Sequence, residues 1–305
     1  MRKFIGLTRR NLLVFFKDGT MVFFSMLTPI IIFFLYLLFL RGTYLSSLEH
    51  HAEQLIDLGL VTSGDLGALA NGLLLTGIMG SALITIPYNC LITLVNDREN
   101  GVDVDVTATP ASRLQIILSY FTASALSAIF MTSVIMTVGL AVLQLSHPTY
   151  VTAGNVLLLF GAMILGAISS TAIFMTFLLF VKSSSASGAF LGILSAASGF
   201  LIGAYIPISD FASEIETICN LFPATGITIL IRRFLLTDLL NHVNDGIGGL
   251  DQGQFVAGIK ESFTLENTLF QKVLTLNQAF LYVIMVTMAF LTAIAIIYPK
   301  TYKRK

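Results

Sequence analysis

The sequence predicts an all-α integral membrane protein whose residues 1–305 form a single domain with six membrane-spanning helices. Two observations predict this class. Hydrophobic residues make up 55% of the chain and charged residues only 11%, whereas soluble domains carry about 25% charged residues. The chain also contains six apolar stretches that reach the length of a spanning helix, which is about 20 residues. A membrane β-barrel would instead show short segments of alternating hydrophobicity.

The six predicted spans contain no Asp, Glu, Lys or Arg. We place them at Met21–Leu40, Leu73–Val95, Leu114–Leu143, Val156–Val181, Ala186–Ile208 and Leu276–Pro299. Ion-coupled transporters usually keep ionisable groups inside the membrane, so their absence argues against a proton-driven carrier. The chain also lacks a phosphate-binding GxxxxGK[ST] loop, so it is not expected to hydrolyse ATP alone.

Residues 1–18 predict an amphipathic helix in the plane of the membrane. Arg2 and Arg9 are seven residues apart, as are Lys3, Arg10 and Lys17, which places these side chains on one face. Apolar residues between them supply the opposite face. Such a helix lies at the interface with its basic side toward anionic headgroups. An ordinary basic flank of the first span is the alternative.

The distribution of Lys and Arg predicts the orientation of the chain. Twelve of the 17 basic residues lie in the N-terminal segment, the second-to-third and fourth-to-fifth connections and the C-terminal tail, and five lie on the opposite side. Because basic residues favour the cytoplasmic side, both termini are predicted to be cytoplasmic in a plasma-membrane protein, and residues 209–272 are predicted to be extracytoplasmic.

The extracytoplasmic segment is predicted to form short helices that lie at, or dip into, the outer interface. Pro207 is expected to end the fifth span. The apolar stretch from Asn220 to Leu240 contains adjacent Arg232 and Arg233, which would be costly to bury in a seventh span. Asn241–Gly253 is rich in Gly and Asp and is typical of a loop.

Small residues recur at helical spacing along the fifth span. The glycines of this stripe are Gly188, Gly192, Gly199 and Gly203. Spacings of this kind let helix backbones approach closely. The stripe predicts helix packing, either within the chain or between two subunits.

The chain shows no pattern typical of a metal site or a disulfide. Cys90 and Cys219 are far apart in the sequence, and the His50–Glu53 stretch, with two adjacent histidines and a glutamate, is better explained as a solvated helix face. No metal, bound cofactor or nucleic-acid partner is therefore expected.

Residues 97–113, DRENGVDVDVTATPASR, form an unusually acidic connection on the side predicted to be cytoplasmic. Four carboxylates in a region whose surroundings are basic suggest docking to a basic partner surface, with a plain solvated turn as the alternative. Pro110 suits the first turn of the third span because proline is tolerated there, with Thr109 as the helix cap.

This connection resembles the corresponding segment of type-2 ABC transporter permeases, Arg-Glu-x-Gly-Thr-Leu-Glu-x-Leu-x-x-Thr-Pro-x-Ser-Arg. The matching residues are Arg98, Glu99, Gly101, Thr109, Pro110, Ser112 and Arg113. The chain departs from the pattern at Val102, Asp103 and Val104, so that the acid is displaced by one position. The resemblance extends over nearly the whole chain through the order of its helices.

The resemblance implies a cavity formed by two permeases, identical or related, above two separate ATP-binding subunits that bind ATP and Mg. Residues 97–113 would be the segment that couples the permease to the ATPase, and we call them the coupling segment. Its candidate contacts are Asp97, Glu99, Gly101, Asp103, Asp105, Pro110 and Arg113. The second and fifth spans would line the substrate path, with candidates Leu74, Ile78, Ser81, Ala82, Thr85, Phe190, Leu194 and Ala197.

The expected function is therefore that of a non-enzymatic membrane subunit of an ATP-driven exporter that works by alternating access. The uncharged spans suit a hydrophobic or amphiphilic substrate such as a drug, a peptide antibiotic or a lipid-linked molecule. A secondary carrier or channel is one alternative, and it predicts ionisable residues within the spans. A non-transporting scaffold or sensor is another, and it predicts a sizeable soluble domain.

Overall fold

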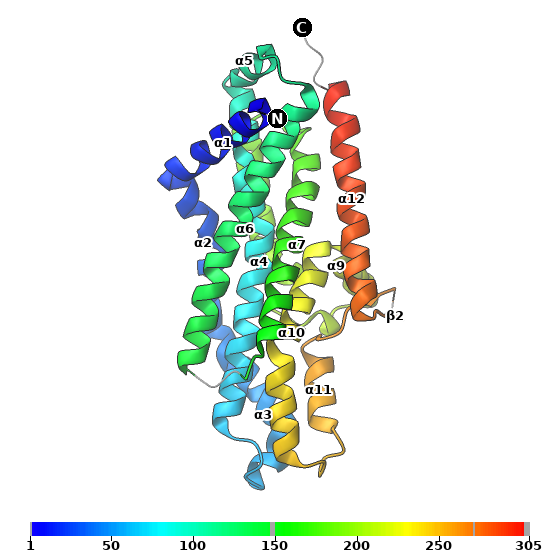
Figure 1. The fold of residues 1–305 in the computed structure, drawn as a ribbon. Helices are drawn as coiled ribbons and strands as arrows, with labels where there is room; N and C mark the ends of the chain where they lie inside the picture. The colour runs from blue at the N-terminus through cyan, green and yellow to red at the C-terminus, as the bar shows by residue number, and fades with distance from the viewer. Residues whose placement is uncertain (1, 147–149, 271, 302–305) are drawn as a thin grey trace.

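The computed structural model describes residues 2–146, 150–270 and 272–301, and nearly all of its regular structure is helical (Figure 1). The elements in chain order are α1 (Arg2–Lys17), α2 (Gly19–Leu35), the π-helical turn η1 (Tyr36–Leu40), α3 (Arg41–Asp57), α4 (Ser63–Glu99), α5 (Val102–Ala108), α6 (Arg113–Ser146), α7 (Ala153–Leu178), α8 (Ser184–Leu201), the 3-10 turn η2 (Ile208–Asp210), α9 (Ser213–Leu221), α10 (Pro223–Ile247), α11 (Gln254–Ser262), β1 (Thr268–Leu269), β2 (Lys272–Val273) and α12 (Leu276–Thr301). The two short strands pair antiparallel.

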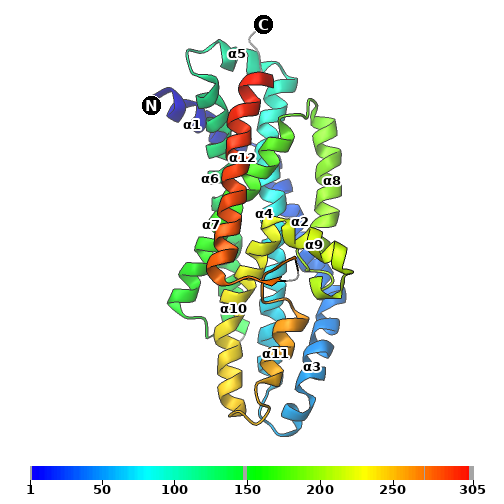
Figure 2. The same cartoon turned by 90° about the vertical axis from the view of Figure 1, so that its right-hand side faces the viewer.

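Six helices among the described residues are long and apolar enough to cross a membrane, which confirms the predicted class. Several of them continue beyond the predicted span. α2, η1 and α3 form one helical stretch of 39 residues. α4 has 37 residues, which makes it about 55 Å long, whereas the hydrocarbon core of a bilayer is about 30 Å thick. α3, the start of α4, the end of α10 and α11 gather at the end of the bundle opposite α5 (Figures 1 and 2).

α4 is the central helix of the bundle. α2, α6, α7, α8 and α10 all pack against it, and it is buried over most of its apolar length. α8 and α12 lie at the periphery, and only 17% of the apolar window of each is buried. Figure 2 shows α8 at one edge of the bundle with α4 on its inner side. Contacts with α4 therefore connect nearly all of the spans to one another.

α1 runs across the bundle rather than along it, and it lies close to α5 (Figure 1). Its buried residues are Thr8, Asn11 and Phe15, and it packs mainly on α6. Arg2, Lys3 and Arg9 stay exposed. This is the arrangement of an amphipathic helix, and its placement in the membrane plane stays a prediction.

The fifth span ends at Leu201, so the predicted end at Ile208 is wrong. Gly203 adopts a left-handed conformation with φ 66°, and the backbone N–H groups of Ala204 and Tyr205 both donate to the Gly199 carbonyl, at 2.8 and 3.2 Å. This is the way in which many helices end. Pro207 lies in the loop that follows and does not end the helix.

The region after α9 also differs from the prediction. The chain bends by 88° between α9 and α10, and α10 then continues without a break for 25 residues to Ile247. It covers the first half of the predicted loop Asn241–Gly253. The bent pair of α9 and α10 has the form of a broken span or a re-entrant loop, and its placement at the outer interface stays a prediction. α9 is short, as expected for this segment.

Arg232 is buried in α10, although the sequence predicts that burial of the adjacent Arg232 and Arg233 in a span would be costly. Only 3% of Arg232 is exposed, whereas Arg233 faces outward. The Arg232 guanidinium donates to the backbone carbonyls of Phe263, Thr264 and Gly203 and to the Thr76 hydroxyl. Burying a charge is tolerated when its hydrogen bonds are replaced, and here oxygens from three other segments replace water.

We predict that Arg232→Leu destabilises the packing of α10 in the bundle, because it leaves the carbonyls to which Arg232 donates without this donor. Each buried unsatisfied group costs about 1–3 kcal/mol. The thermal midpoint of the purified protein in detergent should fall clearly. Arg233→Leu is the matched control and should leave the midpoint nearly unchanged. Equal midpoints for the two variants would contradict this role for Arg232.

Candidate functional site

The coupling segment lies at one end of the bundle, where it joins α4 to α6 (Figure 1). Gly101 reverses the chain after α4 with a left-handed φ of 74°. A Cβ atom added there would meet nothing within 4 Å, so the requirement for glycine is conformational rather than steric. The Gly101 carbonyl then accepts from the Val104 N–H at 3.1 Å as α5 begins.

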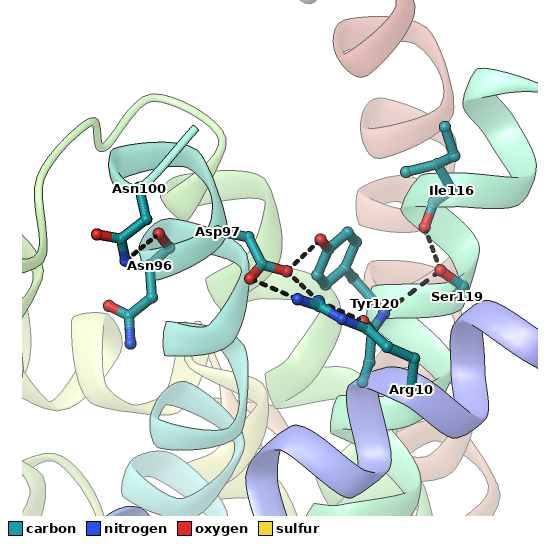
Figure 3. Close-up of polar contacts among 8 residues, drawn as sticks. Arg10, Asn96, Asp97, Asn100, Ile116, Ser119 and Tyr120 are labelled. Carbon is teal, nitrogen blue, oxygen red and sulfur yellow. Dashed lines mark hydrogen bonds and ion pairs between the residues drawn. The ribbon is translucent and has the colours of Figure 1, made fainter. Parts of the chain in front are cut away.

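Asp97 is buried at the end of α4 and is held by two other helices (Figure 3). Arg10 of α1 forms a two-pronged ion pair with its carboxylate, one arm being a hydrogen bond of 2.9 Å. The Tyr120 hydroxyl of α6 donates to the same carboxylate at 2.5 Å. The hydrogen bond to Asp97 raises the pKa of Arg10.

A second contact continues this network between α1 and α6. Arg10 also donates to the Asn11 side-chain carbonyl at 3.0 Å, and the Asn11 amide donates to the Ser119 hydroxyl at 3.4 Å. Asp97, expected among the candidate contacts with the ATPase, therefore faces the interior of its own chain. Its position fixes α1 on the bundle.

Glu99 contacts the start of α8. Its carboxylate accepts a 2.8 Å hydrogen bond from the Ser184 N–H, and the Ser184 hydroxyl donates to the Asn96 side chain at 2.6 Å. A carboxylate at a helix N-terminus satisfies a free N–H group and interacts favourably with the helix dipole. The last turn of α4 is thereby attached to the fifth span.

Three basic side chains attach the same region to the remaining helices. Arg98 donates to the carbonyls that end α7, those of Leu178, Leu179 and Val181. Arg113 donates to the Pro299 carbonyl in the last turn of α12 at 2.7 Å. Lys3 of α1 donates to the Pro110 carbonyl at 3.1 Å. Cations favour the C-terminal ends of helices, where carbonyls lack partners.

The outward face of α5 is the part of the coupling segment that a partner subunit could contact. Val104 is 66% exposed, Asp105, Ala108 and Pro110 are exposed, and Asp103 is half-buried. Of the predicted carboxylates, Asp105 is thus the one turned fully outward on α5. Val104 is not one of the candidate contacts predicted from the sequence, although it is one of the residues that depart from the family pattern.

The start of α6 differs from the prediction. Thr109 ends α5 and does not cap α6, and Pro110 lies outside the helix. Ser112 is the cap: its hydroxyl accepts from the Gln115 N–H at 3.2 Å, and the Gln115 side chain accepts from the Ser112 N–H at 3.1 Å. This is the reciprocal capping box, whose Ser-x-x-Gln pattern stands in the sequence.

The candidate path residues lie in two different surroundings. Leu74 and Ile78 line an apolar groove of about 540 Å³ between α2, α4 and α6. The others are in the interior or between α4 and α8: Ser81, Ala82, Thr85 and Leu194 are buried, and Phe190 and Ala197 are half-buried. Phe190 stacks on Phe177 with ring centres 4.3 Å apart and also contacts Tyr88.

The glycine stripe of α8 does not pack against another helix along its whole length. A Cβ atom at Gly188 or Gly192 would meet nothing within 4 Å in the described part of the chain. Gly199 lies against the ring of Tyr205, and Gly203 lies against Ile208, both from the loop that follows α8. Packing within the chain therefore explains the second pair of glycines and leaves the first pair uncovered.

No cluster of three or more His, Cys, Asp or Glu that could hold a metal ion occurs among the described residues. Cys90 and Cys219 are both free and buried.

Comparison with known families identifies the class of protein. The family model described as "ABC-2 family transporter protein" matches residues 58–298, which include α4, the coupling segment and the spans that follow. The chain therefore belongs to the ABC-2 family and is a membrane permease subunit of an ABC transporter. Comparisons with curated proteins and with solved structures found no match.

We predict that Arg10 and Asp97 are energetically coupled. Arg10→Met leaves the buried Asp97 carboxylate without its cation, and Asp97→Asn weakens the attachment of α1. A double-mutant cycle on thermal stability should give a coupling energy of about 0.5–3 kcal/mol. The control pair Arg9→Met and Asp97→Asn should be additive, because Arg9 is exposed. Additivity in both cycles would contradict the role of the ion pair.

Proposed function

We propose that the chain is the membrane half of an ATP-driven exporter in the plasma membrane, with both termini in the cytoplasm. Two copies of a separate ATP-binding subunit would supply the energy and bind ATP and Mg. The observation that supports this most directly is the combination of an exposed α5 with hydrogen bonds from the coupling segment to five other helices. A force applied to α5 would reach the whole bundle.

The contacts define a route for that force. Displacement of α5 would act on α8 through Glu99 and Ser184, on α1 through Asp97 and Arg10, and on α12 through Arg113. Because α8 lies at the edge of the bundle with an open outer face, it is the span that can move with least disruption of the core. Movement of α8 relative to α4 would then change access to the substrate path by alternating access.

We infer that the substrate is hydrophobic or amphiphilic, such as a drug, a peptide antibiotic or a lipid-linked molecule. The predicted spans lack charged side chains, and a desolvated ion would need such groups or other polar ligands in the membrane. A second permease, identical or related, would complete the substrate cavity.

The docking surface can be tested by purification of the tagged chain from its own cells. An ATP-binding subunit should copurify with the wild-type chain. Val104→Asp combined with Asp105→Lys should abolish copurification, because both side chains lie on the exposed face of α5. Leu250→Asp is the matched control, since Leu250 is 72% exposed at the opposite end of the bundle. Copurification with every variant, or with none, would contradict docking at α5.

The transmission step predicts a different phenotype for Glu99. Glu99→Ala removes the acceptor for the Ser184 N–H, so the ATP-binding subunit should still copurify while substrate export falls. Glu99→Gln keeps an acceptor oxygen and should retain much of the export measured in vesicles. Full export by Glu99→Ala would show that the contact with α8 transmits nothing.

The open face of α8 predicts the interface with the second permease. Gly192→Leu places a large side chain on this face and should reduce the fraction of dimer measured by cross-linking in membranes. Gly161→Leu on α7 is the matched control, because a Cβ atom there also meets nothing within 4 Å. An equal fraction of dimer for both variants would exclude this face as the interface.

A further inference from the structure

The apolar groove between α2, α4 and α6 is separate from the coupling segment. α2 and α6 each pack against α4, which forms the floor of the groove with the half-buried Leu74 and Ile78. Ile30 and Phe33 of α2 form one wall, and Val138 and Val142 of α6 form the other. The volume of about 540 Å³ lies within the range of about 300–1,000 Å³ that is usual for small-ligand sites.

The side chains that line the groove are apolar apart from Asn71 and Ser146. Both of these lie at the same end. Asn71 stands just before the predicted second span, which starts at Leu73, and Ser146 stands just after the predicted third span, which ends at Leu143. The groove thus runs from the membrane interior to the interface on the side away from α5, and it becomes polar only at the interface.

The groove is open on the side that faces the bilayer. Its wall residues Ile30, Val138 and Val142 are 40%, 57% and 56% exposed, and in a membrane such surfaces contact lipid chains rather than water. Its inner limit is set by Gly139, where an added Cβ atom would lie 2.2 Å from Leu75, so that α6 approaches α4 closely there. The α2 wall contains Pro29 and is followed by η1, two features that interrupt regular helical hydrogen bonding.

We propose that this groove binds one acyl chain of a phospholipid from the leaflet opposite the coupling segment, with the ester group of the lipid at Asn71. The apolar tail would fill the space above Leu74 and Ile78. The Asn71 amide can donate a hydrogen bond to an ester carbonyl at the depth where the lipid carries one. The site rests on the membrane spans and on the groove itself, and it does not depend on the proposed ATP-driven export.

The test uses the purified full chain in vesicles of phosphatidylethanolamine and phosphatidylglycerol that contain a phosphatidylglycerol with a diazirine in the middle of one acyl chain. After illumination, mass spectrometry locates the labelled residues. The floor residues Leu74 and Ile78 should be labelled, because the groove brings a lipid chain to them. Labelling of the exposed Met285 and Met288 on α12 serves as the internal standard for ordinary lipid contact.

Two variants fill the groove from opposite walls. Ile30→Trp and Val138→Trp should each reduce labelling of Ile78 severalfold relative to the α12 standard. Ile31→Trp is the matched control, since Ile31 is 46% exposed on the same helix and does not line the groove. Both wall positions are partly exposed, so the substitutions should not prevent folding, and an unchanged α12 signal verifies this.

Several results would overturn the proposal. One is absence of floor labelling in the wild-type protein, and another is equal labelling in Ile30→Trp, Val138→Trp and Ile31→Trp. Asn71→Leu should lower floor labelling by the phospholipid and leave labelling by an ether-linked phosphatidylglycerol with the same diazirine unchanged, because the ether lipid has no ester carbonyl. Equal effects of Asn71→Leu on both probes would contradict the assignment to a phospholipid ester.

Discussion

The buried carboxylate of Asp97 determines how the end of the bundle that carries α5 is built. An ionised carboxylate away from water needs a cation and further donors, and here Arg10 comes from α1 and Tyr120 from α6. Departure of the amphipathic helix from the bundle would remove the cation and leave Tyr120 as the donor to this carboxylate. The orientation of α1, the end of α4 and the start of α6 are therefore fixed together.

The consequence is a set of hydrogen bonds that connects the exposed α5 to the spans. Glu99 and Arg98, the two residues after Asp97, extend the connection to α8 and α7, and Arg113 extends it to α12. Each contact uses the free polar groups at a helix end, which have no partner inside their own helix. The family to which the chain belongs implies an ATP-binding partner, and we propose that these hydrogen bonds transmit the action of that partner to the spans.

The number and order of the spans could be predicted from the sequence because long apolar stretches have few alternatives in a membrane protein. The position of Arg232 could not. The cost of burying Arg232 depends on the carbonyls of Phe263, Thr264 and Gly203, which accept its hydrogen bonds. Only the folded chain brings these carbonyls to Arg232. The predicted end of the fifth span is wrong because Pro207 is a conspicuous helix breaker in the sequence. In the structure the helix ends before Pro207, at the left-handed backbone of Gly203.

The candidate site was predicted in outline and not in its contacts. The coupling segment could be recognised from the resemblance of its residues to a family pattern, but Arg10 and Asp97 are 87 residues apart and no local pattern relates them. The cap of α6 can be predicted from the sequence, since Ser112 and Gln115 form a known capping pattern. Thr109 and Pro110 form a second pattern typical of a helix start, and this second pattern led to the wrong cap. The sequence also gave no sign of which carboxylates would face inward.

The central claim is that α5 and α8 move as one unit when the ATPase acts. The most direct measurement uses pairs of spin labels in the assembled transporter, one pair at Val104 and Ile193 and another at Ile193 and Met285, with distances recorded with and without ATP. The account predicts that the distance from α5 to α8 stays constant and that the distance from α8 to α12 changes. A constant distance between α8 and α12, or an α5 that moves while α8 stays in place, would contradict it.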